Sequence, residues 1–274
     1  MAFKLNNYNI WFAIGLTVFA GLSTGIGGLI VLLFKKTNAK ILSIALGFSA
    51  GVMIYVSFVE IFSESRKLLT SSMGEITGSW INILAFFGGI LLIAIIDKLI
   101  PSYENPHEAH RIEEMDDDCK LNGSKKLLRT GFFTALVITI HNFPEGMATF
   151  ISSIQEPSLG IVIALAIAIH NIPEGISVAI PVYCSTGSRR KALAWSLISG
   201  IAEPVGAIIA YLLLMPILND VVFGVLFAGI AGIMVFISLD ELLPTAREYG
   251  EHHLSIYGLI TGMIVMAISL ILFV

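Results

Sequence analysis

The chain has 274 residues, of which 56% are hydrophobic and 13% are charged, and its formal net charge is −4. The mean hydropathy is +0.87. Soluble domains carry about 25% charged residues, so this composition excludes a soluble globular protein. It is typical of a protein that crosses a membrane several times.

Continuous apolar runs divide the chain into candidate membrane spans. A helix needs about 20 apolar residues to cross about 30 Å of hydrocarbon. Runs of this kind fall at 10–34, 41–63, 80–97, 131–154, 158–182, 192–218, 221–243 and 255–274. A β-barrel is excluded because its strands give short alternating segments. We therefore predict an all-α polytopic membrane protein with eight transmembrane helices, in which residues 1–274 form one transmembrane domain.

Lys and Arg are unevenly divided between the two sides of these spans. With eight spans, one side receives only Lys4, Arg66 and Lys67, and the other side receives the remaining 13 of the 16 basic residues. Short cytoplasmic loops are enriched in Lys and Arg. We therefore predict that both termini lie outside the cell inner (plasma) membrane.

A six-residue motif, HNxPEG, occurs twice, beginning at His141 and at His170. His and Glu stand four residues apart and share one helix face, whereas Asn points about a quarter-turn away. The proline has no N–H, so the carbonyl four residues earlier loses its helical donor. In lipid such a carbonyl is tolerated only beside protein, water or an ion. Each copy thus supplies an imidazole, a carboxylate, an amide oxygen and a distorted backbone.

Ionisable side chains at mid-membrane depth cost a few kcal/mol and need a compensating partner. A bound cation is the simplest one. Nitrogen and oxygen ligands suit Zn²⁺, Fe²⁺, Mn²⁺ or Co²⁺ better than Ca²⁺ or Mg²⁺, which prefer all-oxygen shells. We therefore predict a metal site formed by His141, Glu145, His170 and Glu174.

Two further residues lie at a similar depth. Glu203 is near the middle of 192–218 and is followed by Pro204. No Lys or Arg is expected at that depth, so we predict that Glu203 is a ligand and not half of an ion pair. Met53, near the middle of 41–63, is either a thioether ligand or a gap-filling core residue.

Carboxylates also lie near the ends of the second and seventh spans, at Glu60 and at Asp240-Glu241. They either line the entrance or exit of an ion path or are ordinary interfacial carboxylates.

The longest polar connection is residues 98–130, expected on the cytoplasmic side. It is either a solvated linker or a weak metal-capture loop that uses His107 and His110. Cys119 and Cys184 lack CxxC spacing and are also expected on the cytoplasmic side, where disulfides are rare. We interpret them as free thiols.

Two alternatives to metal uptake follow from the same ligands. An intramembrane metallohydrolase is disfavoured because HExxH is absent, and because the Glu of HNxPEG stands where that motif has its second His. A metal exporter or a proton-dependent exchanger remains open, since a ligand set does not fix the direction of transport.

These features together resemble the ZIP family of divalent-metal transporters. The resemblance rests on the doubled motif, the eight spans, the long cytoplasmic third loop and the location of both termini outside. With His in both motifs and Gly51-Val52-Met53 followed by Glu60, the chain is most similar to the bacterial ZupT branch. The resemblance implies a transporter and not an enzyme, without a resident cofactor, that moves Zn²⁺, Fe²⁺, Mn²⁺, Co²⁺ or Cd²⁺ into the cytoplasm. It also implies a homodimer in the lipid bilayer, with no nucleic-acid partner.

The resemblance further implies a binuclear site. The two His/Glu pairs would hold a primary ion, with Met53 completing that site in some members. The adjacent second ion would be held by Asn142, Asn171 and Glu203, with the motif carboxylates bridging. A 3+2+3 arrangement is implied too, with spans 1–3 and 6–8 related by inversion, and an elevator-like movement of a metal-carrying group of helices.

Overall fold

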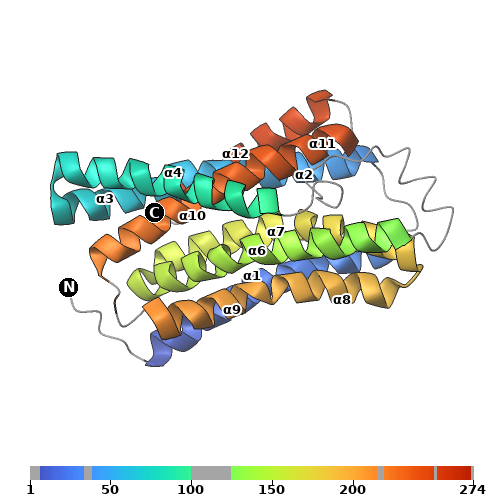
Figure 1. The fold of residues 1–274 in the computed structure, drawn as a ribbon, viewed down its shortest axis with the longest axis horizontal. Coiled ribbons are helices and arrows are strands. Elements are labelled where there is room, and N and C mark those ends of the chain that lie inside the picture. Colours follow the sequence, from blue (N-terminus) through green and yellow to red (C-terminus); the bar gives the residue numbers. More distant parts are fainter. Residues whose placement is uncertain are drawn as a thin grey trace.

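In the computed structural model of this protein, residues 7–33, 39–99, 125–214, 217, 219–249 and 252–272 are described. Over these ranges the chain forms helices and no strand, which confirms the predicted all-α fold (Figure 1). The helices are α1 (Asn7–Leu33), α2 (Ala39–Val56), α3 (Phe62–Met73), α4 (Glu75–Leu99), α6 (Lys125–Gln155), α7 (Pro157–Thr186), α8 (Arg189–Gly200), α9 (Ala202–Ile209), α10 (Asp220–Ile237), α11 (Leu243–Tyr249) and α12 (His252–Leu272).

Three short π-helical segments interrupt the longer helices. They are η1 (Ser57–Ile61), η3 (Ala210–Leu214) and η5 (Ser238–Leu242). η1 joins α2 to α3 and η5 joins α10 to α11 without a break, so each set runs as one continuous helix.

Seven helices or helix runs in the described part of the chain are long and apolar enough to cross a membrane. They cover 9–31, 43–73, 75–98, 157–180, 189–214, 220–247 and 253–272. The predicted fourth span lies on α6, whose 31 residues extend about 46 Å at 1.5 Å per residue. α6 packs along α7, so it has the length and the position of an eighth span. The protein is a multi-pass membrane protein.

The second helix run extends beyond the predicted apolar stretch, which ended at residue 63. The polar residues that follow do not end the helix because they have local partners. Ser65 is buried, and its Oγ lies 2.6 Å from both Asn82 Oδ1 and the carbonyl oxygen of Gly224. Lys67 pairs with Glu64 at 3.0 Å within the same helix.

The helices pack as two bundles, seen in the lower and upper halves of Figure 1. We call α1, α6, α7, α8 and α9 the motif bundle, because α6 and α7 carry the two HNxPEG copies. We call α2, α3, α4, α10, α11 and α12 the companion bundle. The two bundles meet chiefly where α2 packs on α7 and where α10 packs on α6.

Glycines hold each bundle together by allowing close backbone approach, as is common between membrane helices. A Cβ atom built on Gly51 would lie less than 3.0 Å from the Leu259 backbone, and one on Gly89 would meet Gly229 in the same way. Wherever a described glycine makes so close an approach, its nearest neighbours belong to its own bundle. The backbones therefore interlock within the bundles and not between them.

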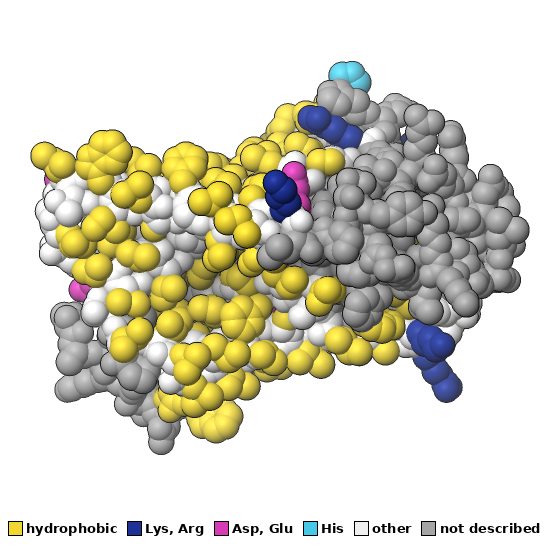
Figure 2. Space-filling view, in the orientation of Figure 1, with side chains coloured by type: hydrophobic (Ala, Val, Ile, Leu, Met, Phe, Trp, Pro, Cys, Tyr) yellow, Lys and Arg dark blue, Asp and Glu magenta, His cyan; other side chains and the backbone are white. Residues whose placement is uncertain are grey.

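Hydrophobic side chains cover most of the described surface along the helices (Figure 2). On α4, for example, Leu84, Phe87 and Leu91 are all more than half exposed. The interior, by contrast, contains many buried hydroxyl, amide and carboxylate groups. This inside-out distribution of polarity is expected of a protein whose solvent is lipid.

The glycine contacts predict a difference between two substitutions in the companion bundle. Gly51→Ala should destabilise the protein by about 1–3 kcal/mol, because overpacking forces α2 and α12 apart. Gly88→Ala should change stability by less than about 0.5 kcal/mol, because nothing lies within 4 Å of the added Cβ. Thermal unfolding of the purified variants in one detergent measures both effects, and equal melting temperatures would contradict the proposed packing.

Candidate metal centre

The two HNxPEG copies lie side by side in the motif bundle, because α6 and α7 pack along each other. Both helices continue through their motif prolines, Pro144 and Pro173. Asn142, Glu145, His170, Asn171 and Glu174 are each at most 1% exposed. The structure thus brings polar groups from both copies into one dry region of the bundle.

The motif glycines explain how neighbouring helices reach this region. A Cβ on Gly146 would lie less than 3.0 Å from the backbone of Glu203 in α9, and one on Gly175 would meet the backbone of Thr24 in α1. The last residue of each motif is therefore a contact point where a third helix packs against the metal-ligand candidates.

His170 and Glu145 form a pair across the two helices. His170 Nε2 lies 3.2 Å from Glu145 Oε1, and the two side chains are 0% and 1% exposed. The second oxygen of this carboxylate, Oε2, is buried and has no hydrogen-bond partner in the described part of the chain. The sequence-predicted grouping of these two residues is thus present in the structure. The side chain of His141 lies outside the described residues, although its backbone is part of α6.

Asn171 and Glu203 form a second contact between α7 and α9. Asn171 Nδ2 donates to Glu203 Oε1 and also to the carbonyl oxygen of Ala20, at 3.1 Å for the latter. Glu203 is fully buried.

Asn142 is held in the same manner. Its Nδ2 donates to the carbonyl oxygen of Ser199 at 3.3 Å. The amide nitrogens of both motif asparagines are therefore occupied. Asn142 Oδ1, Asn171 Oδ1 and Glu203 Oε2 are buried and have no hydrogen-bond partner among the described residues.

No Lys or Arg side chain is buried beside the carboxylates of this centre in the described part of the chain. Glu145, Glu174 and Glu203 are all buried there. Buried carboxylates are costly unless their charge is compensated, and a divalent cation would compensate it. Among the described residues, which do not include the His141 side chain, no group of three His, Cys, Asp or Glu side chains is close enough to hold a metal ion.

Met53 belongs to the companion bundle and faces the interface with the motif bundle. It is fully buried. Ser49, one turn earlier on the same face of α2, donates to the carbonyl oxygen of His170 at 3.2 Å. Met53 is therefore on the helix face that meets α7.

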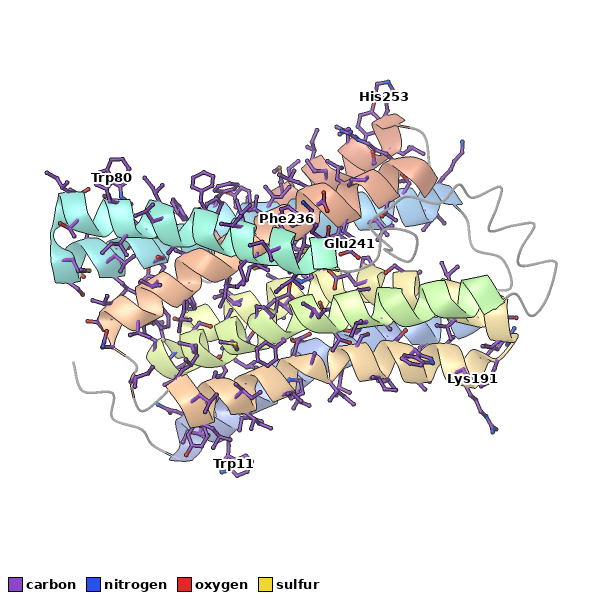
Figure 3. All side chains as sticks on the ribbon, viewed as in Figure 1. Trp11, Trp80, Lys191, Phe236, Glu241 and His253 are labelled. Carbon is purple, nitrogen blue, oxygen red and sulfur yellow. The ribbon has the colours of Figure 1, made fainter. Side chains whose placement is uncertain are left out.

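Glu60 lies away from this centre. It lines a cavity of about 270 Å³ at the turn between α6 and α7, together with Glu64, Gln155, Glu156, Ser158, Leu159, Val162 and Leu270. Glu241 is 6% exposed in η5 and lies near the middle of the view in Figure 3, away from that turn.

Sequence reasoning missed the backbone carbonyls that hold the asparagines, because those carbonyls carry no side-chain signal. Outside this centre, it had the carboxylates of the second and seventh spans but not the full repeat around them: Gly51-x-Met53, Ser57 and Glu60 match Gly232-x-Met234, Ser238 and Glu241 at equal spacing. Both copies contain a π-helical segment at the same place, a feature common at functional sites. The two helices run in opposite directions (Figure 1).

The remaining candidate residues lie outside the described part of the chain. His107, His110 and Cys119 fall in the segment 100–124, and the side chain of Cys184 is likewise not among the described ones.

Known proteins are similar to this chain over most of its length. The family profile described as "ZIP Zinc transporter" matches residues 98–270, which include both motifs. The chain is 62% identical over 259 residues to "Zinc transporter ZupT" of Streptococcus mutans, covering 94% of this chain and 96% of the relative. It is 59% identical over 266 residues to the protein of the same name from Lysinibacillus sphaericus, covering 97% and 99%.

Proposed function

Since the chain belongs to the ZIP family of metal transporters, we propose that it carries divalent transition-metal ions, Zn²⁺ among them, into the cytoplasm. The carrying site is the His/Glu/Asn centre on α6, α7 and α9. The observation that carries the proposal is the group of buried carboxylates with no buried Lys or Arg in the described part of the chain. The family consists of transporters and not enzymes, which excludes an intramembrane metallohydrolase.

The ligands support a range of transported metals. Zn²⁺ is favoured by the names of the relatives, and Fe²⁺, Mn²⁺, Co²⁺ and Cd²⁺ are included because imidazole and carboxylate ligands accept all of them. These ions are cargo, and no resident cofactor is proposed.

We assign the primary ion to His141, Glu145, His170 and Glu174, with Met53 as the thioether ligand that completes the site. The contact between His170 and Glu145 supports this assignment. The second ion is assigned to Asn142, Asn171 and Glu203, whose remaining oxygens have no partner among the described residues. The motif carboxylates bridge the two positions.

The two bundles support an elevator-like movement. The close glycine approaches make each bundle a firmly packed unit, and none of those described joins one bundle to the other. The motif bundle holds all the proposed ligands except Met53, so it would carry the ions while the companion bundle stays still. Alternating access around a mid-membrane site needs such a division.

Metal and protons compete for the same atoms in this centre. An imidazole must be neutral and a carboxylate ionised to bind a metal. Acid should therefore weaken loading. An exporter or a proton-dependent exchanger would use the same ligands, and only a measured direction of flux separates these alternatives from uptake.

We also propose that residues 1–274 form one transporter domain in the inner (plasma) membrane, with both termini outside. Lys40, Lys191 and Arg247 belong to the ends of α2, α8 and α11 on the right of Figure 1, whereas Arg66 and Lys67 lie in α3 on the left. This division agrees with a cytoplasmic location of the former side. A homodimer is proposed from the family resemblance alone.

The first test measures uptake by purified protein in liposomes. External Zn²⁺ should enter protein-containing vesicles faster than empty ones, other divalent transition metals should compete, and lower pH should slow the entry. Alanine at His141, Glu145, His170 or Glu174 should reduce the rate to near that of empty vesicles, because each change removes a primary ligand. Glu75→Ala is the matched control, since Glu75 is exposed and pairs with Arg66. Four well-folded variants with near-normal uptake would refute the site.

The second test concerns orientation. In a protein with Cys119 and Cys184 replaced by Ser, Phe3→Cys and Phe273→Cys should react with an impermeant thiol reagent added to intact cells. Met115→Cys should react only after lysis, because the basic loops are held on the cytoplasmic side. The reverse labelling pattern would overturn the topology and the side from which ions enter.

The third test separates the two ion positions. Glu203→Ala should lower the number of Zn²⁺ ions bound per chain, or change which metals compete, while leaving measurable uptake, since the four primary ligands remain. His141→Ala should impair uptake of every metal. If both variants are equally inactive for all metals, with unchanged selectivity, Glu203 belongs to a single shared site.

A further inference from the structure

We propose that the crossing of α1 and α8 at Gly21 and Gly200 is a positioning element for the second ion. It holds the amides of Asn142 and Asn171 so that both present oxygen, and not nitrogen, to the ion. The inference rests on the binuclear site of the proposed function, and it assigns to two glycines a part in metal selection.

The crossing is a mutual backbone contact. A Cβ on Gly21 would lie less than 3.0 Å from the carbonyl oxygen of Gly200, and a Cβ on Gly200 equally close to the carbonyl oxygen of Gly21. Only glycine at both positions allows this approach. Pro204 helps to leave the Gly200 carbonyl available at the crossing, because proline has no N–H to donate to the carbonyl four residues earlier. The helix is interrupted by a turn at Ile201.

Each of the two glycines directly follows a residue whose backbone carbonyl accepts a hydrogen bond from one of the motif asparagines. Ala20 precedes Gly21 and accepts from Asn171 Nδ2 at 3.1 Å. Ser199 precedes Gly200 and accepts from Asn142 Nδ2 at 3.3 Å. The two acceptors come from different helices, yet the crossing fixes both. A change in the distance between α1 and α8 would therefore disturb both asparagines.

The contacts select one orientation of each amide. An asparagine side chain has an oxygen that accepts and an NH₂ group that only donates. Rotating either amide by half a turn would set its oxygen against a backbone carbonyl oxygen, which is repulsive, and would present NH₂ to the ion. NH₂ has no lone pair for a metal. In the observed orientation, the oxygens of both amides and Glu203 Oε2 are buried without a partner in the described part of the chain.

The second position would consequently be rich in oxygen, in contrast with the imidazole-containing primary position. Oxygen ligands favour harder cations such as Mn²⁺, and imidazole suits Zn²⁺. The orientation of two amides thus bears on which metals compete, and the glycine crossing determines that orientation.

The test compares Gly21→Ala and Gly200→Ala with the unchanged protein in detergent and in liposomes. Zn²⁺ bound per chain, measured by elemental analysis after equilibrium dialysis, should fall from about two toward one. The concentration of Mn²⁺ needed to compete with Zn²⁺ uptake should rise about tenfold, equivalent to about 1.4 kcal/mol. Uptake of Zn²⁺ itself should persist, because the primary ligands are untouched.

Two glycines serve as matched controls. Gly15→Ala is on the same helix as Gly21 but has nothing within 4 Å of the new Cβ, so it should change neither quantity. Gly258→Ala meets the Ile44 backbone at less than 3.0 Å, but in the companion bundle. It should lower the melting temperature as Gly21→Ala does, with bound Zn²⁺ and Mn²⁺ competition unchanged. If Gly21→Ala behaves like Gly258→Ala, the crossing serves only packing and the inference is wrong.

Pro204→Ala keeps the inference testable if the glycine variants do not fold, because it adds no bulk at the crossing. It returns an N–H to the Gly200 carbonyl and should straighten the chain at Ile201, which moves the Ser199 carbonyl away from Asn142. The same loss of one bound ion and the same weaker Mn²⁺ competition are expected, and unchanged values would overturn the inference.

Glu203→Ala separates this inference from its premise. If Glu203→Ala alters neither bound Zn²⁺ nor metal competition, the second ion itself is absent and the binuclear proposal fails. If Glu203→Ala alters them and the Gly21, Gly200 and Pro204 variants do not, the second ion stands and only the positioning role is lost.

Discussion

The rest of this structure depends on three buried carboxylates. Glu145, Glu174 and Glu203 lie in the interior of a protein whose exterior is lipid-like, and no Lys or Arg is buried in the described part of the chain. Such groups destabilise a fold unless a cation or protons compensate them. A site whose negative charge is costly when empty and is compensated by a cation is well suited to binding a divalent ion, and it also explains why metal and protons should compete there.

The surrounding backbone is arranged to keep oxygen atoms available. The motif prolines leave carbonyls without their helical donors, and the amide nitrogens of Asn142 and Asn171 are satisfied by carbonyls of other helices. In a well-packed interior nearly all buried polar atoms have partners. Four buried oxygens without a partner among the described residues lie in this centre, on Asn142, Glu145, Asn171 and Glu203, where a bound metal would supply the missing interaction.

Packing by glycine has a second consequence, for movement. Membrane helices gain little from the hydrophobic effect on associating, and they depend on close van der Waals contact through small residues. Here the close contacts lie within each bundle. The repeated segments around η1 and η5 lie in the companion bundle, and the helices that contain them are antiparallel to each other. If the motif bundle moves as proposed, this repeat would offer it similar surroundings in both directions.

The sequence by itself determined the helical class, the approximate spans and the residue types of the centre. Those properties are local: the length of an apolar run decides whether a helix can cross a membrane, and the spacing within HNxPEG decides which side chains share a face. The tertiary structure decided which atoms are used. Asn171 and Ala20 are 151 positions apart, and Asn142 and Ser199 are 57 apart. No local pattern predicts that their amides and carbonyls meet, because that depends on how distant helices cross. The continuation of α2 through η1 into α3 was likewise decided by Asn82 and Gly224, whose contacts with Ser65 compensate a polar residue that ends the apolar run in the sequence.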